Sequence, residues 1–198
     1  MKLYIRTIEE YDGVDAGLLE EKRRRRLARI SSPKVRAECI AAGMLLREAL
    51  ADYGWPVGDR PLELAYGDGG KPYLASFAEN AAPGFSLSHS GKLVVCAVDD
   101  EDIGVDVQEV RKVSARLPKK VLSDAELAEY QRLLSSGAES EATGYFIVRW
   151  TEKESIAKLT GKGLGEDFRS LYTSQYRIHT LFHAVDGVEY IVSTAQYL

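Results

Sequence analysis

The segment Ile103-Gly-Val-Asp-Val-Gln108 has the alternation of a β-strand. Successive side chains of a strand point to opposite faces, so Val105 and Val107 share one face while Asp106 and Gln108 share the other. The valine face needs an apolar core to cover it. The opposite face presents two oxygen-bearing side chains side by side. The segment therefore predicts a strand that packs on one face and offers polar ligands on the other.

A second segment, centred on Glu154, has the spacing of a helix. Trp150, Glu154 and Lys158 fall four residues apart, which stacks them on one helix face. If this helix packs on the strand, Glu154 joins Asp106 and Gln108 as a third hard oxygen ligand. Oxygen ligands beside a cation such as Lys158 suit Mg²⁺ and a phosphate substrate. The alternative is an exposed Glu154–Lys158 salt bridge on the helix surface, which contributes only about 0.2–0.5 kcal/mol.

The whole chain predicts an α+β fold. Ser32 followed by Pro33 is a typical helix start, and Asp186-Gly187 is a strong hairpin turn. We expect strands at 2–8, 62–66, 85–91, 93–98, 103–108, 175–185 and 188–194, and helices at 16–30, 33–53, 123–134 and 141–160.

Composition excludes several classes of function. The 198 residues carry a net charge of -4, which argues against a nucleic-acid partner. Cys39 and Cys96 sit in apolar runs, as core residues of a protein in the reducing cytoplasm do. No signal peptide opens the chain and no apolar run is long enough to span a bilayer, so we expect a cytoplasmic protein without a membrane partner.

Two turns carry candidate phosphate ligands. Lys71 lies in a glycine-rich turn, but Pro72 follows it where a Walker loop requires Ser or Thr. Lys71 is therefore either an exposed turn residue or a phosphate contact. His89 ends a strand between Ser88 and Ser90, and it is either structural or part of a site.

Cations also gather on the first two helices. The run Lys22–Arg26 is either a solvated helix face or the source of one or two phosphate ligands. Lys34 and Arg36 lie in the first turn of the next helix, where positive charge opposes the helix dipole. A bound anion would offset that cost, although a simple surface location explains these residues equally well.

Four sequence blocks, taken together and in this order, resemble those of the Sfp-type (surfactin-synthetase-activating) 4'-phosphopantetheinyl transferases. Any one block alone would be a weak signal, but the set spans most of the chain. The blocks are Gly70-Lys-Pro-Tyr73, Phe85-Ser-Leu-Ser-His-Ser-Gly91, Ile103-Gly-Val-Asp106, and Trp150-Thr-Glu-Lys-Glu-Ser155 followed by Lys158 and Gly161-Lys-Gly-Leu164.

The resemblance implies a monomer of two pseudo-symmetric α/β halves with the active site in the cleft between them. Residues 1–101 would bind coenzyme A, and residues 102–198 would carry the metal and catalytic groups. The implied reaction transfers 4'-phosphopantetheine from coenzyme A to a serine hydroxyl of an apo acyl, peptidyl or aryl carrier protein. It requires Mg²⁺ and releases adenosine 3',5'-bisphosphate.

The resemblance also implies roles for the polar residues of the second half. Asp106 and Glu154 match the metal ligands, Glu154 also matches the proposed base, and Lys158 matches the residue that contacts the attacked phosphate. Many relatives carry Glu where this chain has Gln108. That departure predicts a metal site with two carboxylates plus water, with weaker Mg²⁺ binding or a preference for Mn²⁺.

In the first half the resemblance implies contacts to coenzyme A. Lys71 and His89, with Ser88 beside it, match contacts to the coenzyme A phosphates. Lys34 and Arg36 are the nearest candidates for the cations that hold the 3'-phosphate, in a region where the match is loose.

Partner binding is predicted at a basic stretch. Residues 111–120 carry five cations and no acidic residue, and carrier proteins are commonly acidic around their serine. We expect the carrier protein to dock there, the alternative being a merely solvated basic segment. A rival function of another class is a non-catalytic module that binds coenzyme A or another nucleotide through Lys71, His89 and the N-terminal cations.

Overall fold

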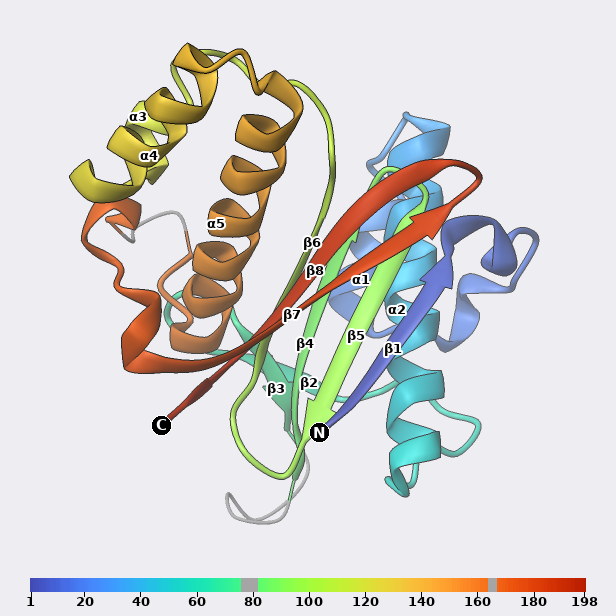
Figure 1. The fold of residues 1–198 in the computed structure, drawn as a ribbon. Coiled ribbons are helices and arrows are strands. Elements are labelled where there is room, and N and C mark those ends of the chain that lie inside the picture. The colour runs from blue at the N-terminus through green and yellow to red at the C-terminus, as the bar shows by residue number, and fades with distance from the viewer. Residues whose placement is uncertain (76–81, 164–166) are drawn as a thin grey trace.

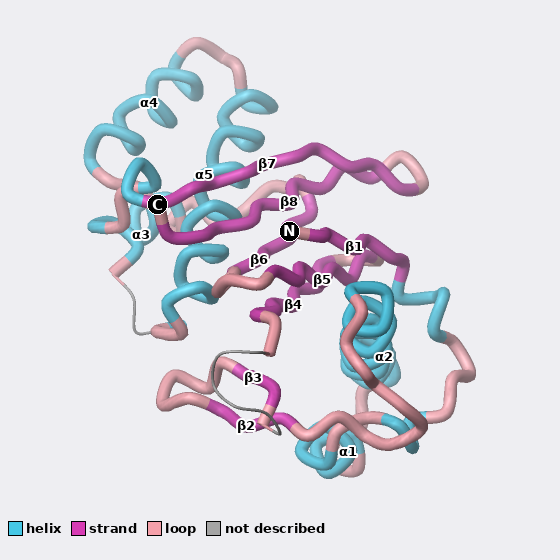
Figure 2. Tube along the Cα trace, turned by 90° about the horizontal axis from the view of Figure 1, so that it is seen from below, coloured by secondary structure: helices cyan, strands magenta, loops and turns pink. Residues whose placement is uncertain are grey.

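A computed structural model describes residues 1–75, 82–163 and 167–198. Two three-stranded antiparallel sheets form the middle of the molecule, with α1 and α2 on one side and α3, α4 and α5 on the other (Figures 1 and 2). The first sheet has the strand order β1-β5-β4, the second has the order β6-β8-β7, and β2 pairs with β3.

The helices and strands, with short 3₁₀ turns labelled η, confirm the mixed helix and sheet class. In chain order they are β1 (Lys2–Thr7), η1 (Ile8–Tyr11), η2 (Ala16–Leu18), α1 (Glu21–Leu27), α2 (Pro33–Tyr53), β2 (Leu64–Tyr66), β3 (Pro72–Leu74), β4 (Gly84–Ser90), β5 (Leu93–Asp99), β6 (Gly104–Glu109), α3 (Pro118–Val121), α4 (Asp124–Ser135), α5 (Glu139–Thr160), η4 (Phe168–Ser170), η5 (Thr173–Gln175), β7 (Tyr176–Val185) and β8 (Val188–Tyr197).

Helix α2 covers the first sheet. It begins where the sequence predicted, because the Ser32 side chain accepts a hydrogen bond from Val35 N and Pro33 occupies the first turn. It ends at Gly54, whose φ of 97° is left-handed. Its buried face packs on the continuous apolar strand β5 and on Phe85 of β4. This packing fixes the position of β4, the strand that carries Ser88 and His89.

The prediction of one continuous helix over 16–30 was wrong. The segment forms the short η2, an extended link and then α1. Glu20 is extended, with φ −59° and ψ 153°, and its side chain caps α1 by accepting from Arg23 N. The same carboxylate accepts from the hydroxyl of Tyr66, and the adjacent Leu19 is 1% exposed. Burial and this distant contact outweigh the helix propensity of the segment.

Helix α5 lies against the second sheet at very close range. A Cβ atom at Gly104 would stand 1.9 Å from the carbonyl oxygen of Ser155, so only glycine allows β6 to approach the helix backbone this closely. The face of β6 that carries Asp106 consequently meets α5. The last two strands close as the predicted hairpin, with φ values of 53° at Asp186 and 77° at Gly187.

Strands β4 and β6 lie side by side where the two sheets meet (Figure 1). Side chains join them there, because Ser86 Oγ accepts from Val105 N at 3.0 Å and Ser90 Oγ accepts from Glu109 N at 3.1 Å. Residues 86, 88 and 90 share one face of β4 because the side-chain period of a strand is two. We call these three residues the serine seam.

A buried lysine ties α5 to the elements packed on it. Lys153 is 0% exposed, and its ammonium donates to Val121 O at 3.0 Å, Glu126 Oε2 at 2.6 Å and Phe168 O at 2.9 Å. Glu126 also forms the predicted capping box with Ser123 at the start of α4. One side chain thus secures α3, α4 and η4 to the helix that carries Glu154.

Within the three described ranges, no helix is both long enough and apolar enough to cross a membrane.

Candidate active site

Asp106 of β6 is the centre of the candidate site. The residue is 3% exposed, and donors from β4, β6 and α5 form hydrogen bonds to its side chain. Oδ1 accepts from Ser88 Oγ at 2.7 Å and from Lys158 Nζ at 2.7 Å, and Oδ2 accepts from Gln108 Nε2 at 2.9 Å. Lys158 therefore pairs with a strand residue far away in the sequence, which argues against a salt bridge confined to the helix surface.

Glu154, one helical turn before Lys158, lies close enough to Asp106 for their charges to interact. Burial raises the pKa of Glu154 above its ordinary value, and the negative charge of Asp106 raises it further, whereas Lys158 lowers it. Glu154 is half-buried rather than solvated. Strand β6 and helix α5 thus bring together two carboxylates and one ammonium, as the spacing of these residues predicted.

The donor set at this point fits a hard divalent cation. Asp106 and Glu154 supply carboxylate oxygens that repel each other, a repulsion that a cation between them would relieve. Gln108 presents its amide nitrogen to Asp106, and a half-turn of the amide would present its oxygen instead. No group of three His, Cys, Asp or Glu side chains suited to a metal occurs among the described residues. Two carboxylates with an amide suit Mg²⁺, which retains several waters.

Lys71, which precedes β3, joins the two-stranded hairpin β2–β3 to the end of α5. Its ammonium donates to Leu159 O and to Asp102 Oδ1, both at 2.9 Å. A cation at the carbonyl end of a helix is favourable because the helix dipole is negative there. The loop comes so close that a Cβ at Gly69 would stand 1.6 Å from Gly161 O. The last residue of the predicted motif, Leu164, lies outside the described residues.

A cavity of about 260 Å³ opens between these segments. Three cations from separate elements line it, namely Arg23 of α1, Lys71 and Lys158 of α5, together with the apolar Phe85 and Leu87 of β4. None of its described lining residues is acidic. Arg23 Nε is buried without a hydrogen-bond partner, although Glu20 Oε1 lies 3.6 Å away. The cavity is therefore suited to an anion with an apolar portion.

His89 lies in a predominantly positive environment. Burial lowers the pKa of His89 below its ordinary value, while the charge of Glu38, whose Oε2 lies 4.0 Å from Nδ1, raises it. The positive charges of Lys158, Arg26 and Arg23 lower it further. His89 is half-exposed, so it can meet a ligand from solution. At neutral pH the ring is neutral and offers one donor and one acceptor.

The sequence did not decide whether the cations of α1 are solvated or bind phosphate. The structure places them in different surroundings from the cations of α2. Lys34 is exposed with its ammonium 4.0 Å from Glu38 Oε1, and Arg36 donates to the Leu27 carbonyl oxygen. Arg23 lines the cavity instead, and Arg26 lies near enough to His89 to affect its charge. The signal in the sequence is their spacing of three residues, which puts both on one face of α1.

The predicted docking stretch, residues 111–120, follows β6 directly. Most of it is an irregular loop that leads into the short helix α3. Five cationic side chains are exposed along it: Arg111, Lys112, Arg116, Lys119 and Lys120. They form a positive surface that begins two residues after Glu109, the last residue of the strand that bears Asp106.

Comparisons with known proteins point to one family. Residues 102–186 match the family model of the 4'-phosphopantetheinyl transferase superfamily. A 4'-phosphopantetheinyl transferase of Bacillus subtilis is 32% identical over 127 residues, which are 63% of this chain and 52% of the relative. One from Bacillus pumilus is 44% identical over 80 residues, 40% of this chain and 33% of the relative. The 4'-phosphopantetheinyl transferase HetI of Nostoc is 33% identical over 147 residues, 71% of this chain and 59% of the relative. The chain thus spans between a third and three fifths of the length of these relatives.

Proposed function

We propose that this chain is a member of the 4'-phosphopantetheinyl transferase superfamily and that it transfers 4'-phosphopantetheine from coenzyme A to a serine hydroxyl of an apo carrier protein. Adenosine 3',5'-bisphosphate is the second product. The observation that carries the proposal is the approach of Lys158 to within 2.7 Å of Asp106, beside Glu154, at the edge of a cavity lined by cations. The family model matches residues 102–186, the part of the chain that holds these three residues.

Asp106, Glu154 and Gln108 are the residues that would hold a divalent cation, Mg²⁺ or Mn²⁺. When bound, such an ion neutralises negative charge on a diphosphate and orients it. The chain itself keeps Asp106 in one orientation through the hydrogen bonds from Ser88 and Lys158. Fixing the carboxylate before the substrate arrives lowers the ordering cost of binding.

Glu154 and Lys158 supply the proton handling and the charge stabilisation. Glu154 accepts the proton of the attacking serine hydroxyl while that oxygen forms a bond to phosphorus. The bond from the same phosphorus to the bridging oxygen of the diphosphate breaks, and the leaving phosphate departs with both electrons. Lys158 stabilises the charge that develops on the phosphate oxygens.

Coenzyme A lies, in this proposal, between two pseudo-symmetric halves formed by residues 1–101 and 102–198. The cavity offers Arg23, Lys71 and Lys158 to its phosphates, and its apolar wall suits a pantetheine chain. His89 is a further phosphate contact. Lys34 and Arg36 remain predictions for the 3'-phosphate.

Mass spectrometry on an apo carrier protein incubated with coenzyme A and Mg²⁺ tests the function directly. The carrier should gain the mass of one phosphopantetheine group, and a chelator should abolish that gain. A non-catalytic module would bind coenzyme A without changing the mass of the carrier. An unchanged mass across acyl, peptidyl and aryl carriers would contradict the proposal.

Gln108→Glu is expected to increase the affinity for the metal. A third carboxylate, placed beside Asp106, attracts a divalent cation more strongly than the neutral amide of Gln108 does. The Mg²⁺ concentration that gives half-maximal transfer should fall. The half-maximal concentrations of Mg²⁺ and Mn²⁺ should also become more similar. Titration of each metal against the transfer rate measures this. An unchanged half-saturation would mean that position 108 is not a ligand.

Reversing the charges of Arg111, Arg116 and Lys120 to glutamate is expected to weaken carrier docking. A positive surface accelerates encounter with an acidic partner by about 10-fold or more, and salt screens that attraction. The KM for the carrier should rise by about that factor and lose most of its salt dependence, while kcat stays nearly constant. Steady-state kinetics at several salt concentrations measure both quantities.

The matched control reverses three exposed arginines outside the stretch, Arg60, Arg132 and Arg177. It changes the net charge by the same amount, so a general electrostatic effect would appear in both variants. Equal effects of the two variants would mean that residues 111–120 are not the docking surface.

A further inference from the structure

The serine seam contains one member that differs from the other two. Ser86 and Ser90 accept hydrogen bonds from the backbone N–H groups of Val105 and Glu109. Such bonds satisfy donors at the edge of β6 and hold the two sheets together. Their partners are main-chain atoms, so the two outer serines serve the packing of strand on strand.

Ser88, between them, donates its hydroxyl to the side chain of Asp106. The two oxygens lie 2.7 Å apart, with Ser88 8% exposed and Asp106 3% exposed. A hydrogen bond to a carboxylate is roughly twice as strong as one between neutral groups. Among the described donors to Asp106, Ser88 is the one from the first sheet, since Gln108 belongs to β6 and Lys158 to α5.

Ser88 and His89 are neighbours on β4 and therefore point to opposite faces of the strand. His89 faces Glu38 and the cations of α1, whereas Ser88 faces Asp106. Ser88 and His89 thus connect two parts of the site: the cations of α1, which suit phosphates, and the carboxylate of Asp106, which suits a metal.

From this arrangement, and on the premise of the proposed transferase function, we propose that Ser88 is a positioning residue for the divalent cation. Its hydroxyl orients the Asp106 carboxylate and fixes the cation's position relative to the first sheet. Groups that hydrogen-bond to a metal-binding carboxylate contribute about 10- to 100-fold to metal affinity or activity. The contact of Ser88 with coenzyme A that the sequence predicted remains a separate prediction.

The test measures metal and nucleotide binding separately in the purified chain. Mn²⁺ is titrated in the absence of coenzyme A, and the free ion is followed by electron paramagnetic resonance. Ser88→Ala should weaken Mn²⁺ binding by about 10-fold or more. Ser88→Thr, which keeps the hydroxyl, should restore most of the affinity. Binding of adenosine 3',5'-bisphosphate without metal, measured by calorimetry, should stay unchanged in both variants.

Ser90→Ala is the matched control, because it also removes one hydroxyl and one hydrogen bond of the serine seam. It should lower the thermal midpoint about as much as Ser88→Ala does, yet leave Mn²⁺ affinity intact. A loss of Mn²⁺ affinity that is equal in the two variants would overturn the inference, because the seam would then act only through stability.

Two further outcomes would also overturn it, and they are distinguishable. If Ser88→Ala binds Mn²⁺ normally but loses the bisphosphate, Ser88 is a coenzyme A contact and only the positioning role fails. If the unmodified chain binds Mn²⁺ no better than Asp106→Asn does, the metal site itself fails, and the proposed function loses its central feature as well.

Discussion

Glu154→Gln is expected to slow phosphopantetheine transfer by about 10²- to 10⁴-fold, the usual contribution of a general base. Glutamine keeps the size of the side chain and a metal-binding oxygen, but it does not accept a proton from the carrier serine. The serine hydroxyl would then have to lose its proton to water. Single-turnover rates of mass gain on the carrier, at saturating coenzyme A, measure the chemical step without interference from product release.

Glu152→Gln supplies the matched control from the same helix. Glu152 is 8% exposed, and its carboxylate accepts from Arg149 Nη1 at 2.7 Å and from Thr180 Oγ1 at 3.5 Å. Burial raises the pKa of Glu152 as it does that of Glu154. Its partners lie on α5 and the second sheet, so its variant should transfer at nearly the normal rate. A comparable loss of rate in both variants would remove Glu154 from the mechanism.

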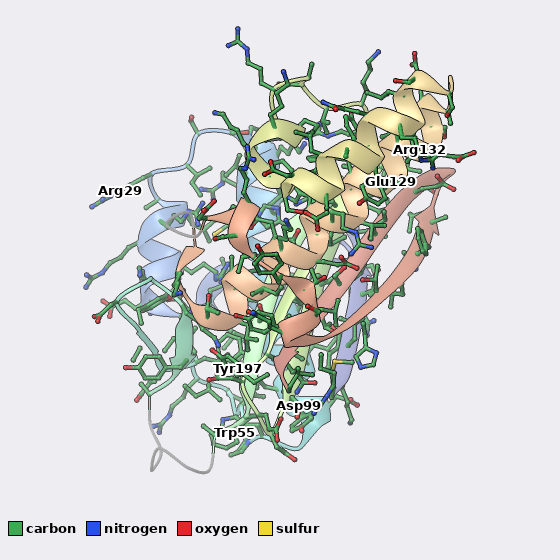
Figure 3. The ribbon with its side chains drawn as sticks, turned by 60° about the vertical axis from the view of Figure 1, so that its left-hand side comes forward. Arg29, Trp55, Asp99, Glu129, Arg132 and Tyr197 are labelled. Carbon is green, nitrogen blue, oxygen red and sulfur yellow. The ribbon has the colours of Figure 1, made fainter. Side chains whose placement is uncertain are left out.

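Lys153→Met is expected to destabilise the fold by about 3–5 kcal/mol, because it removes one partner of a buried ion pair. The apolar replacement leaves Val121 O, Phe168 O and Glu126 Oε2 without their shared donor. Urea denaturation followed by circular dichroism measures the free energy of unfolding. An exposed pair on α4 supplies the control: Arg132 and Glu129 lie side by side at the surface (Figure 3), and Arg132→Met should leave the stability unchanged.

The Lys153 interaction also makes the stability depend on pH. Burial by itself raises the pKa of Glu126, but the hydrogen bond from Lys153 and the one from Ser123 N outweigh burial and hold that pKa below its ordinary value of 4.5. A carboxylate whose pKa is lower when folded stabilises the fold above the unfolded pKa. Its contribution should be complete at neutral pH and disappear as the pH falls below 4.5 through the folded pKa. Glu126→Gln should remove this acid dependence, and unchanged acid curves would contradict the assignment.

Local signals predicted those parts of the fold whose causes are local. Ser32 with Pro33, the Ser123–Glu126 capping box and Asp186-Gly187 each define a helix start or a turn within four residues, and all three were confirmed. The segment 16–30 failed for the opposite reason. Its break at Leu19 and Glu20 depends on core packing and on the hydroxyl of Tyr66, 46 residues further along the chain.

The features of the candidate site also fall into those with local causes, which the sequence predicted, and those that depend on distant contacts. The spacing of Asp106, Glu154 and Lys158 predicted that they converge, because strand and helix periodicity fix which side chains share a face. Contacts between segments far apart in the chain left no comparable spacing pattern in the sequence. The burial of Lys153 among three acceptors, the lining of the cavity by Arg23 and the hydrogen bond from Ser88 to Asp106 each depend on which elements meet in space.

The contact between Gly104 and α5 has a consequence for any attempt to redesign this protein. Asp106 lies two residues beyond Gly104, and Glu154 lies one residue before Ser155, whose carbonyl oxygen a Cβ atom at position 104 would meet. Even a methyl group at position 104 would force the helix away from the strand and part the two carboxylates. Mutant libraries aimed at acceptance of modified coenzyme A should therefore hold this residue constant. Diversity belongs at Leu87, a partly buried residue of the apolar wall, whereas Phe85 is a core residue on which α2 packs.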